Sequence, residues 1–285
     1  MESKGSPTAK PTQDTVGLGR TPGQRGAEVI AGLRAQLIPS PVTKTLSTFT
    51  GRMFAQILMG MENRAAVNFV IARYLGFKEF VRQALEALTA VTNNITVVDL
   101  AAGFNPRNFD LAQEWPNVTF IEIDLPDVVA EKEKRLQKAY SLVLPSNIQW
   151  LSADLGVDPL HKILENQQVH VVTAEGLNAY FTPAEVTQIA ANIRPNLVPG
   201  GWYVSDIPWK TGMDKIAESA RFFSRQAGEF KCILNDKEEA AALMQNAGYD
   251  PVDVMHFSEL PFRADIPEEL IEFAFLVRAQ KPTKE

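Results

Sequence analysis

The sequence predicts an α/β fold in which helices cover both faces of an open, mostly parallel sheet. Three observations predict it. From residue 95 onward, short runs rich in Val and Ile alternate with helical segments. Several of these runs are apolar on both faces, which is typical of buried parallel strands. The chain has 285 residues, of which 45% are hydrophobic, enough for one large domain of this kind.

Composition excludes several classes of protein. The net charge of −6 disfavours nonspecific nucleic-acid binding, which needs a basic face. No run of 18 apolar residues predicts a membrane span, and the polar N-terminus does not resemble a secretory signal. One cysteine and three widely spaced histidines predict neither a disulfide nor a metal centre. We therefore expect a reduced, cytoplasmic protein that binds no nucleic acid, no membrane and no metal.

The N-terminal third divides into two parts. Residues 1–25 are predicted to be a flexible tail, because more than half of them are Gly, Pro, Ser or Thr and few are large and apolar. Part of this tail could close over a ligand. Residues 26–90 are predicted to form a helical cap. Its helical patterns cover residues 26–38, 42–60, 62–74 and 78–88.

Residues 91–285 are predicted to form the sheet and its crossover helices. Strands are expected at 95–100, 118–123, 148–151, 169–174, 201–206, 252–257 and 271–278. Helices are expected at 106–114, 127–140, 159–167, 183–197, 213–227 and 237–247. The alternation implies right-handed crossovers and a doubly wound sheet. No helical pattern separates the last two strands, so we expect a hairpin that adds an antiparallel edge.

Acidic residues lie at or just after four of the expected strands. They are Asp99, Asp124, Asp154 and Glu175. Ligands of such sheets bind beyond the carboxyl ends of the strands. Asp124 lies 21 positions after Gly103 (124 − 103), near the spacing at which a carboxylate accepts hydrogen bonds from ribose hydroxyls. Single acidic residues at such places are often helix N-caps, but four together favour a nucleoside site.

The loop after the first strand indicates which nucleoside ligand is bound. A dinucleotide needs several glycines there, because its pyrophosphate must lie against bare backbone at a helix N-terminus. This loop has Ala101, Ala102 and a single Gly103. S-adenosylmethionine carries no phosphate and suits the loop better. A nicotinamide-dependent oxidoreductase stays open as an alternative.

Several motifs follow one another between residues 72 and 201. They are Ala72-Arg73-Tyr74, the stretch from Val98 to Arg107, Ile121-Glu122-Ile123-Asp124-Leu125-Pro126-Asp127, Ala174-Glu175-Gly176-Leu177, Tyr180-Phe181 and Pro199-Gly200-Gly201. The chain from about Glu62 to Asp206 resembles the leucine carboxyl methyltransferase family. It is most similar to its bacterial branch, the S-adenosylmethionine-dependent O-methyltransferases associated with polyketide biosynthesis. The resemblance implies a Rossmann-like class I methyltransferase sheet, an N-terminal helical lid and S-adenosyl-L-methionine as cofactor.

The resemblance also implies roles for residues of this chain. Arg73 would pair with the methionine carboxylate, Gly103 and its neighbours would line the methionine part, and Asp124 would bind the ribose. Asp154 and Leu155 would contact the adenine, and Glu175 would lie beside the amino-acid part. The predicted cofactor site also includes Asp99, Ala101, Leu125 and Gly176. The family usually has glycine where this chain has Ala101, which keeps a non-catalytic cofactor-binding protein open.

The methyl acceptor is less well determined by the sequence. A carboxylate acceptor needs no base, whereas a hydroxyl needs one unless it ionises readily, and no convincing base is found. Tyr180 and Asn178 are predicted to orient the acceptor. An insertion near residues 207–235 supplies aromatic residues for a pocket, namely Trp209, Phe222, Phe223 and Phe230. We expect methylation of an oxygen in a small apolar or aromatic metabolite, with a protein C-terminal carboxylate as the alternative. A homodimer is compatible with the sequence.

Overall fold

The computed structural model describes residues 21–140, 144–260 and 266–283. The greater part of the predicted tail, residues 1–20, lies outside the described residues. Helix α1 begins at Pro22, four residues before the expected start of the helical cap. Thr21 caps it, because its side chain accepts a hydrogen bond from the backbone N–H of Gln24 at 3.2 Å.

The sheet has seven strands in the described chain, in the order β3-β2-β1-β4-β5-β7-β6. They are β1 (Ile95–Leu100), β2 (Val118–Asp124), β3 (Ile148–Ser152), β4 (Val169–Ala174), β5 (Leu197–Pro208), β6 (Val252–Met255) and β7 (Ala274–Gln280). The first five pair in parallel, and β7 is antiparallel to both β5 and β6. This confirms the predicted doubly wound sheet with an antiparallel edge.

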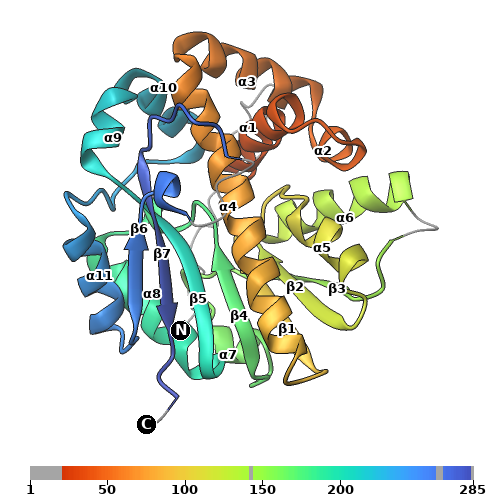
Figure 1. Ribbon diagram of the computed structural model, residues 1–285. Helices are drawn as coiled ribbons and strands as arrows, with labels where there is room; N and C mark the ends of the chain where they lie inside the picture. The colour runs from red at the N-terminus through yellow and green to blue at the C-terminus, as the bar shows by residue number, and fades with distance from the viewer. Residues whose placement is uncertain (1–20, 141–143, 261–265, 284–285) are drawn as a thin grey trace, which may run out of the picture.

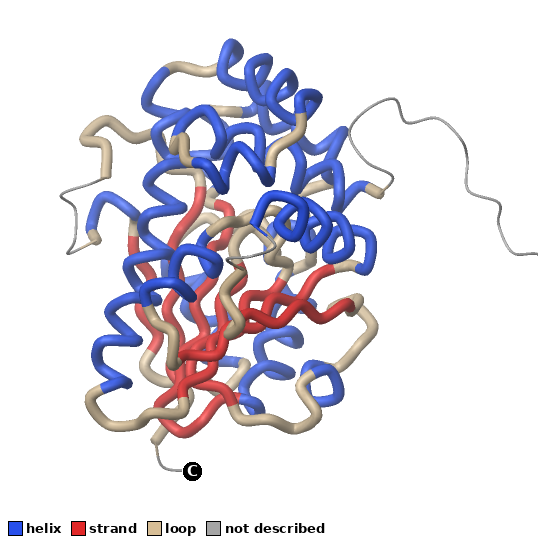
Figure 2. The backbone as a smooth tube through the Cα atoms, turned by 90° about the vertical axis from the view of Figure 1, so that its right-hand side faces the viewer, coloured by secondary structure: helices blue, strands red, loops and turns tan. Residues whose placement is uncertain are grey.

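Helices cover both faces of the sheet (Figure 1, Figure 2). One face carries α4 (Arg64–Thr89), α5 (Arg107–Glu114) and α6 (Pro126–Tyr140), and the other carries α7 (Leu160–Ile163), α8 (Pro183–Ile193) and α11 (Lys237–Asn246). Alternate residues of β1 enter separate apolar clusters, Ile95 and Val97 on the α5 side and Val98 and Leu100 on the α8 side. The described residues also include three short 3₁₀ helices, at Asn178–Tyr180, Arg194–Asn196 and Phe257–Glu259.

Helix α4 is one helix of 26 residues, where the sequence predicted two. Gly76 lies between the two expected segments. It does not break the helix; the absence of a side chain here instead leaves room for neighbouring side chains. A Cβ atom at Gly76 would lie 3.0 Å from side-chain atoms of Leu260 and Phe257. The glycine therefore allows α4 to pack against the chain that follows β6.

The remaining helices gather at the end of the sheet where the parallel strands finish (Figure 1). They are α1 (Pro22–Leu37), α2 (Pro41–Leu46), α3 (Phe49–Met61), α9 (Lys210–Lys215) and α10 (Ala217–Ala227). Helices α1 and α3 cross closely, since a Cβ atom at Gly32 would lie 2.2 Å from the carbonyl oxygen of Gly51. The single segments expected at 42–60 and 213–227 are each two helices. No helix in the described chain is long and apolar enough to cross a bilayer.

Candidate functional site

A cavity of about 540 Å³ lies between the strand ends and the N-terminal helices. It contains eleven of the twelve residues that the sequence predicted for the site. They are Arg73, Asp99, Ala101, Gly103, Asp124, Leu125, Asp154, Leu155, Glu175, Gly176 and Tyr180. The strand order reverses between β1 and β4, and ligands of doubly wound sheets bind at such a point. The cavity is therefore where this fold places a ligand.

The loop after β1 is fixed by Asp124, which ends β2. The backbone N–H of Gly103 donates to Asp124 Oδ2 at 2.6 Å, and that of Leu125 donates to Oδ1 at 2.7 Å. Ala101 and Gly103 both have a φ of 50°, in the left-handed region that favours glycine. Burial raises the pKa of Asp124 to about 6, although these two N–H groups oppose the rise. Each carboxylate oxygen keeps a lone pair for a ligand hydroxyl.

Asp99 is deeper in the molecule than the other acidic residues. It lies within β1, on the face that α5 covers, and its side chain is only 1% exposed. Arg107 Nη2 is 2.7 Å from Asp99 Oδ2, and Thr173 Oγ1 donates to Oδ1 at 2.7 Å. Asp99 thus reaches the cavity wall, but Oδ2 holds the fully buried Arg107 and Oδ1 is taken by Thr173.

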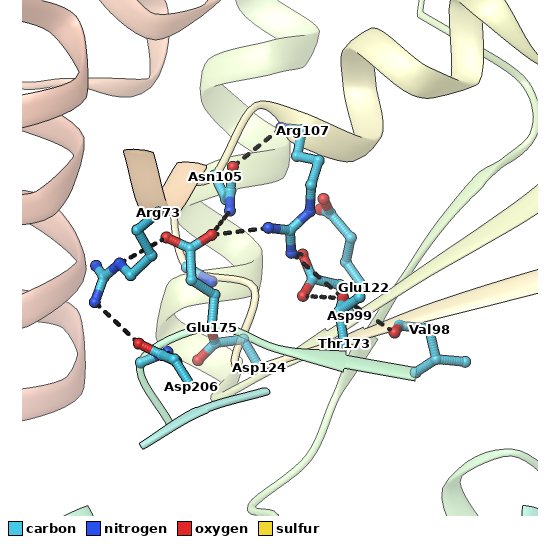
Figure 3. A network of polar contacts seen from close by, with 12 residues as sticks. Arg73, Val98, Asp99, Asn105, Arg107, Glu122, Asp124, Thr173, Glu175 and Asp206 are labelled. Carbon is cyan, nitrogen blue, oxygen red and sulfur yellow. Dashed lines mark hydrogen bonds and ion pairs between the residues drawn. The ribbon is translucent and has the colours of Figure 1, made fainter. Parts of the chain in front are cut away.

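Glu175, just after β4, is the centre of a charged network (Figure 3). Its carboxylate is paired with Arg34 at 2.6 Å, Arg107 at 2.8 Å and Arg73 at 3.3 Å. Asn105 Nδ2 donates a further hydrogen bond at 3.0 Å. Burial alone would raise the pKa of Glu175, but the three guanidinium groups outweigh it and lower the pKa to about 2. The carboxylate is therefore ionised at any physiological pH.

Arg73 joins this network to the end of β5. Its Nη1 lies 3.3 Å from Asp206 Oδ2 (Figure 3). The backbone N–H of Gly176 donates to Asp206 Oδ1 at 2.6 Å. Arg34 Nε is buried and has no hydrogen-bond partner in the described chain, and Arg73 Nε is held only by the 3.3 Å ion pair with Glu175. Buried donors without partners are costly, so this end of the cavity suits an anionic group such as a carboxylate.

The structure separates the predicted residues Tyr180 and Asn178. Tyr180 lines the cavity, and burial raises the pKa of its hydroxyl to about 12, so it is neutral at pH 7 and can donate a hydrogen bond. Asn178 is fully buried outside the cavity lining, and its Oδ1 accepts from Tyr203 Oη at 3.3 Å. The 3₁₀ turn points the two side chains in different directions, so this placement gives no support to an acceptor-orienting role for Asn178.

The adenine end and the aromatic pocket residues are also placed. Asp154 is exposed at the cavity edge, where its Oδ1 accepts from the N–H of Gly156 at 3.0 Å. Of the four predicted aromatic residues, Phe223 and Phe230 line the cavity. Trp209 instead packs against His256 and Phe275, and Phe222 packs against Phe54; neither lines the cavity.

Sequence reasoning assigned no role to three residues of the network, Arg34, Arg107 and Asp206. Arg34 carried a signal that could have found it, because it falls on the apolar face of α1, at helical spacing from Ala27 and Ile30. An arginine on a buried face needs a counter-charge. Its partner Glu175 lies 141 residues later in the chain, so periodicity alone could not name it.

Comparison with known proteins gives one family match. Residues 27–194 match the family model described as leucine carboxyl methyltransferase, a span of more than half the chain. The chain belongs to this family. The matched segment includes Arg73, the loop after β1, Asp124 and Glu175, so it carries most of the network described above. The match supports an enzyme of the methyltransferase class. No functionally curated protein sequence matches the chain.

Solved structures share the fold at low sequence identity. A protein from Thermobifida fusca assigned as a methyltransferase has a TM-score of 0.63 at 17% identity, covering 90% of this chain and 94% of its own. An O-methyltransferase family protein from Burkholderia thailandensis has a TM-score of 0.54 at 15% identity, covering 93% and 72%. The CurJ carbon methyltransferase has a TM-score of 0.55 at 14% identity, covering 88% of this chain and 70% of its own. These neighbours show the class I methyltransferase fold, and they include both oxygen and carbon methylation.

Proposed function

We propose that this protein is an S-adenosylmethionine-dependent methyltransferase that methylates an oxygen of a small apolar or aromatic metabolite. One observation carries the proposal. A single cavity joins the charged ends of the parallel strands to a chamber lined by the N-terminal helices and α10. A nucleoside cofactor and an apolar acceptor can therefore occupy one enclosed space, as methyl transfer requires.

The residues at the strand ends fit this cofactor. Asp124 offers acceptors for the ribose hydroxyls, and the exposed Asp154 offers acceptors near the adenine. Arg34 offers an unpaired Nε donor, and Arg73 a second guanidinium group, for the amino-acid carboxylate. No glycine-rich phosphate loop is present in the described chain, since Ala101 and Ala102 precede Gly103. When bound, the cofactor supplies an already activated methyl group, so the protein's main task is to align the acceptor with it.

The protein groups nearest the acceptor favour an oxygen that ionises readily. The three histidines, all within the described chain, do not line the cavity. Tyr180 is a donor at neutral pH because burial raises the pKa of its hydroxyl to about 12. It can orient an acceptor oxygen but does not remove its proton. A phenol or a carboxylic acid, which ionises without a strong base, fits these groups better than an aliphatic alcohol.

Labelled methyl transfer tests the proposal. The protein is incubated with a cell extract and S-adenosylmethionine carrying an isotopically labelled methyl group, and mass spectrometry follows the label in small molecules and in proteins separately. Label in an oxygen of a small apolar molecule supports the proposal. Label on carbon or nitrogen contradicts O-methylation. Tight cofactor binding without label in any fraction identifies a non-catalytic cofactor-binding protein.

A protein C-terminal carboxylate is the second candidate acceptor. The family description, leucine carboxyl methyltransferase, favours it. The apolar lining favours a small molecule instead, because Phe223, Phe230 and Met213 enclose the space that a polar peptide end would enter. Label confined to the C-termini of proteins would select this second candidate.

A further inference from the structure

The chamber proposed for the acceptor has largely apolar walls, to which the helices add a polar pair, Glu62 and Ser219. Its walls include Ile30, Leu58, Val70, Met213, Ile216 and Phe223. Glu62, from the corner between α3 and α4, and Ser219, from α10, also line it. Ser219 Oγ donates to Glu62 Oε1 at 2.5 Å. A carboxylate is thus fixed in an otherwise apolar part of the chamber.

Local structure does not account for Glu62. The cap of α4 is supplied by Asn63, whose Oδ1 accepts from the backbone N–H of Ala66 at 3.0 Å. Ser219 is nearly buried, and its Oγ lies 3.1 Å from the carbonyl oxygen of Ile216. In the described chain no Lys, Arg or His pairs with Glu62, and its Oε2 has no protein donor. Glu62 is half-buried, so its Oε2 is open to the cavity, and a ligand that fills this part of the chamber must offer it a donor.

We propose that Glu62, held in place by Ser219, binds a hydrogen-bond donor on the end of the acceptor that is remote from the methylated oxygen. The acceptor is then an apolar molecule with a hydroxyl or a protonated amine at that end. This inference rests on the proposed function. It makes Glu62 a specificity-determining residue, because an acceptor without the donor would leave the carboxylate unpaired.

Three matched naphthalenes test the inference. They are 2,6-dihydroxynaphthalene, 6-methoxy-2-naphthol and 2-naphthol, which carry at the second position a donor, an acceptor only, or neither. Their binding to the protein saturated with S-adenosylhomocysteine is measured by calorimetry. The dihydroxy compound should bind about tenfold more tightly than the methoxy compound, the effect of one hydrogen bond to a charged group. Equal binding of all three, or binding of none, overturns the inference.

Variants separate this role from a structural one. Glu62→Met should bring the three affinities together, and Ser219→Ala should reduce the difference severalfold, since Glu62 loses its orienting partner. Glu229→Gln, at an exposed residue of the same cavity, should leave the difference unchanged. If Glu62→Met lowers the melting temperature but keeps the discrimination, Glu62 is only structural and the inference fails. Failure of the proposed function looks different, because it shows either as no binding of S-adenosylhomocysteine itself or as no label in an oxygen of a small molecule in the transfer assay.

Discussion

Asp124 shows how a single residue serves both the fold and the ligand. Its two oxygens fix the backbone of Gly103 and Leu125, and the same carboxylate faces the cavity. Burial of this position disfavours the ionised carboxylate and raises the pKa of Asp124 to about 6. A residue with such a pKa changes charge close to physiological pH, and its ligand binding should change with it.

Cofactor affinity should therefore depend on pH. Ribose hydroxyls donate to the ionised carboxylate, which is the minor form at pH 5 and the major form at pH 7 when the pKa is about 6. Affinity for S-adenosylhomocysteine should rise up to about tenfold between pH 5 and 7, because the ionised fraction rises about tenfold. Asp124→Asn should weaken binding by about 1–3 kcal/mol at pH 7 and remove most of the dependence. Calorimetry at several pH values measures the affinity of the wild type and of Asp124→Asn for S-adenosylhomocysteine. The same change of affinity with pH in both proteins would refute the ribose role.

Arg107 should be a strong determinant of stability. It is 0% exposed and pairs with Asp99 and Glu175, so Arg107→Met leaves two buried carboxylates with fewer counter-charges. Breaking such a pair costs about 3–5 kcal/mol of unfolding free energy. The control is Arg82→Met, whose ion pair with Glu114 is 41% exposed on the arginine side and should contribute less than about 1 kcal/mol. Similar urea-unfolding losses in the two variants would contradict this assignment.

Ala101 carries strain that its neighbour Gly103 does not. Both have a φ of 50°, which costs an alanine about 1–2 kcal/mol and a glycine almost nothing. Ala101→Gly relieves this strain but gives the unfolded chain more entropy, worth about 0.4–1 kcal/mol. We expect a net stabilisation of up to about 1 kcal/mol, read from the urea midpoint. A lower midpoint would show that the left-handed conformation is not strained.

At the scale of elements, the strand positions were predicted better than the helix boundaries, although β5 is twice as long as expected and β7 begins three residues later than expected. The first and last residues of β1 and β4 were predicted correctly. Both strands are buried, so the change from apolar to polar sequence marks their ends. The division of α4 at residues 75–77 was wrong, because Gly76 serves close packing against Leu260. The ion-pair partners of Arg34 and Arg107 could not be predicted, since pairs between distant elements leave no periodic signal.

The crossing of α1 and α3 should control the cavity. Gly32→Ala would place a methyl group 2.2 Å from the Gly51 carbonyl oxygen, so the helices must separate. Helix α1 carries Arg34, and its Gly26 and Gly23 line the cavity. We expect a loss of stability of about 1–3 kcal/mol and weaker S-adenosylhomocysteine binding. Gly60→Ala, in α3 with open space around it, should instead stabilise by up to about 1 kcal/mol and leave binding unchanged. Equal effects of the two variants would contradict this role of the crossing.

At the scale of the whole molecule, the sheet supplies charge and the helical cap supplies apolar surface. The parallel strands bring Asp124, Glu175 and Asp206 to one edge, although 82 residues (206 − 124) separate the first from the last. The N-terminal helices α1 and α3 and the helix α10 that follows β5 then close the space above them (Figure 1). The fold class and the nucleoside edge could be predicted from sequence, because both depend on strand order and strand ends. The apolar chamber was predicted in part, since Phe223 and Phe230 line it, but Trp209 and Phe222 do not, because α1, α3 and α10 meet only in three dimensions.

The central claim is that this edge binds a nucleoside without phosphate groups. Calorimetric titration of the full chain with S-adenosylhomocysteine and, separately, with nicotinamide adenine dinucleotide tests it most directly. The account predicts saturable one-to-one binding of S-adenosylhomocysteine, weakened in Asp124→Asn, and far weaker or no binding of the dinucleotide. Tighter binding of the dinucleotide, or the same affinity for S-adenosylhomocysteine in the wild type and the variant, would contradict it.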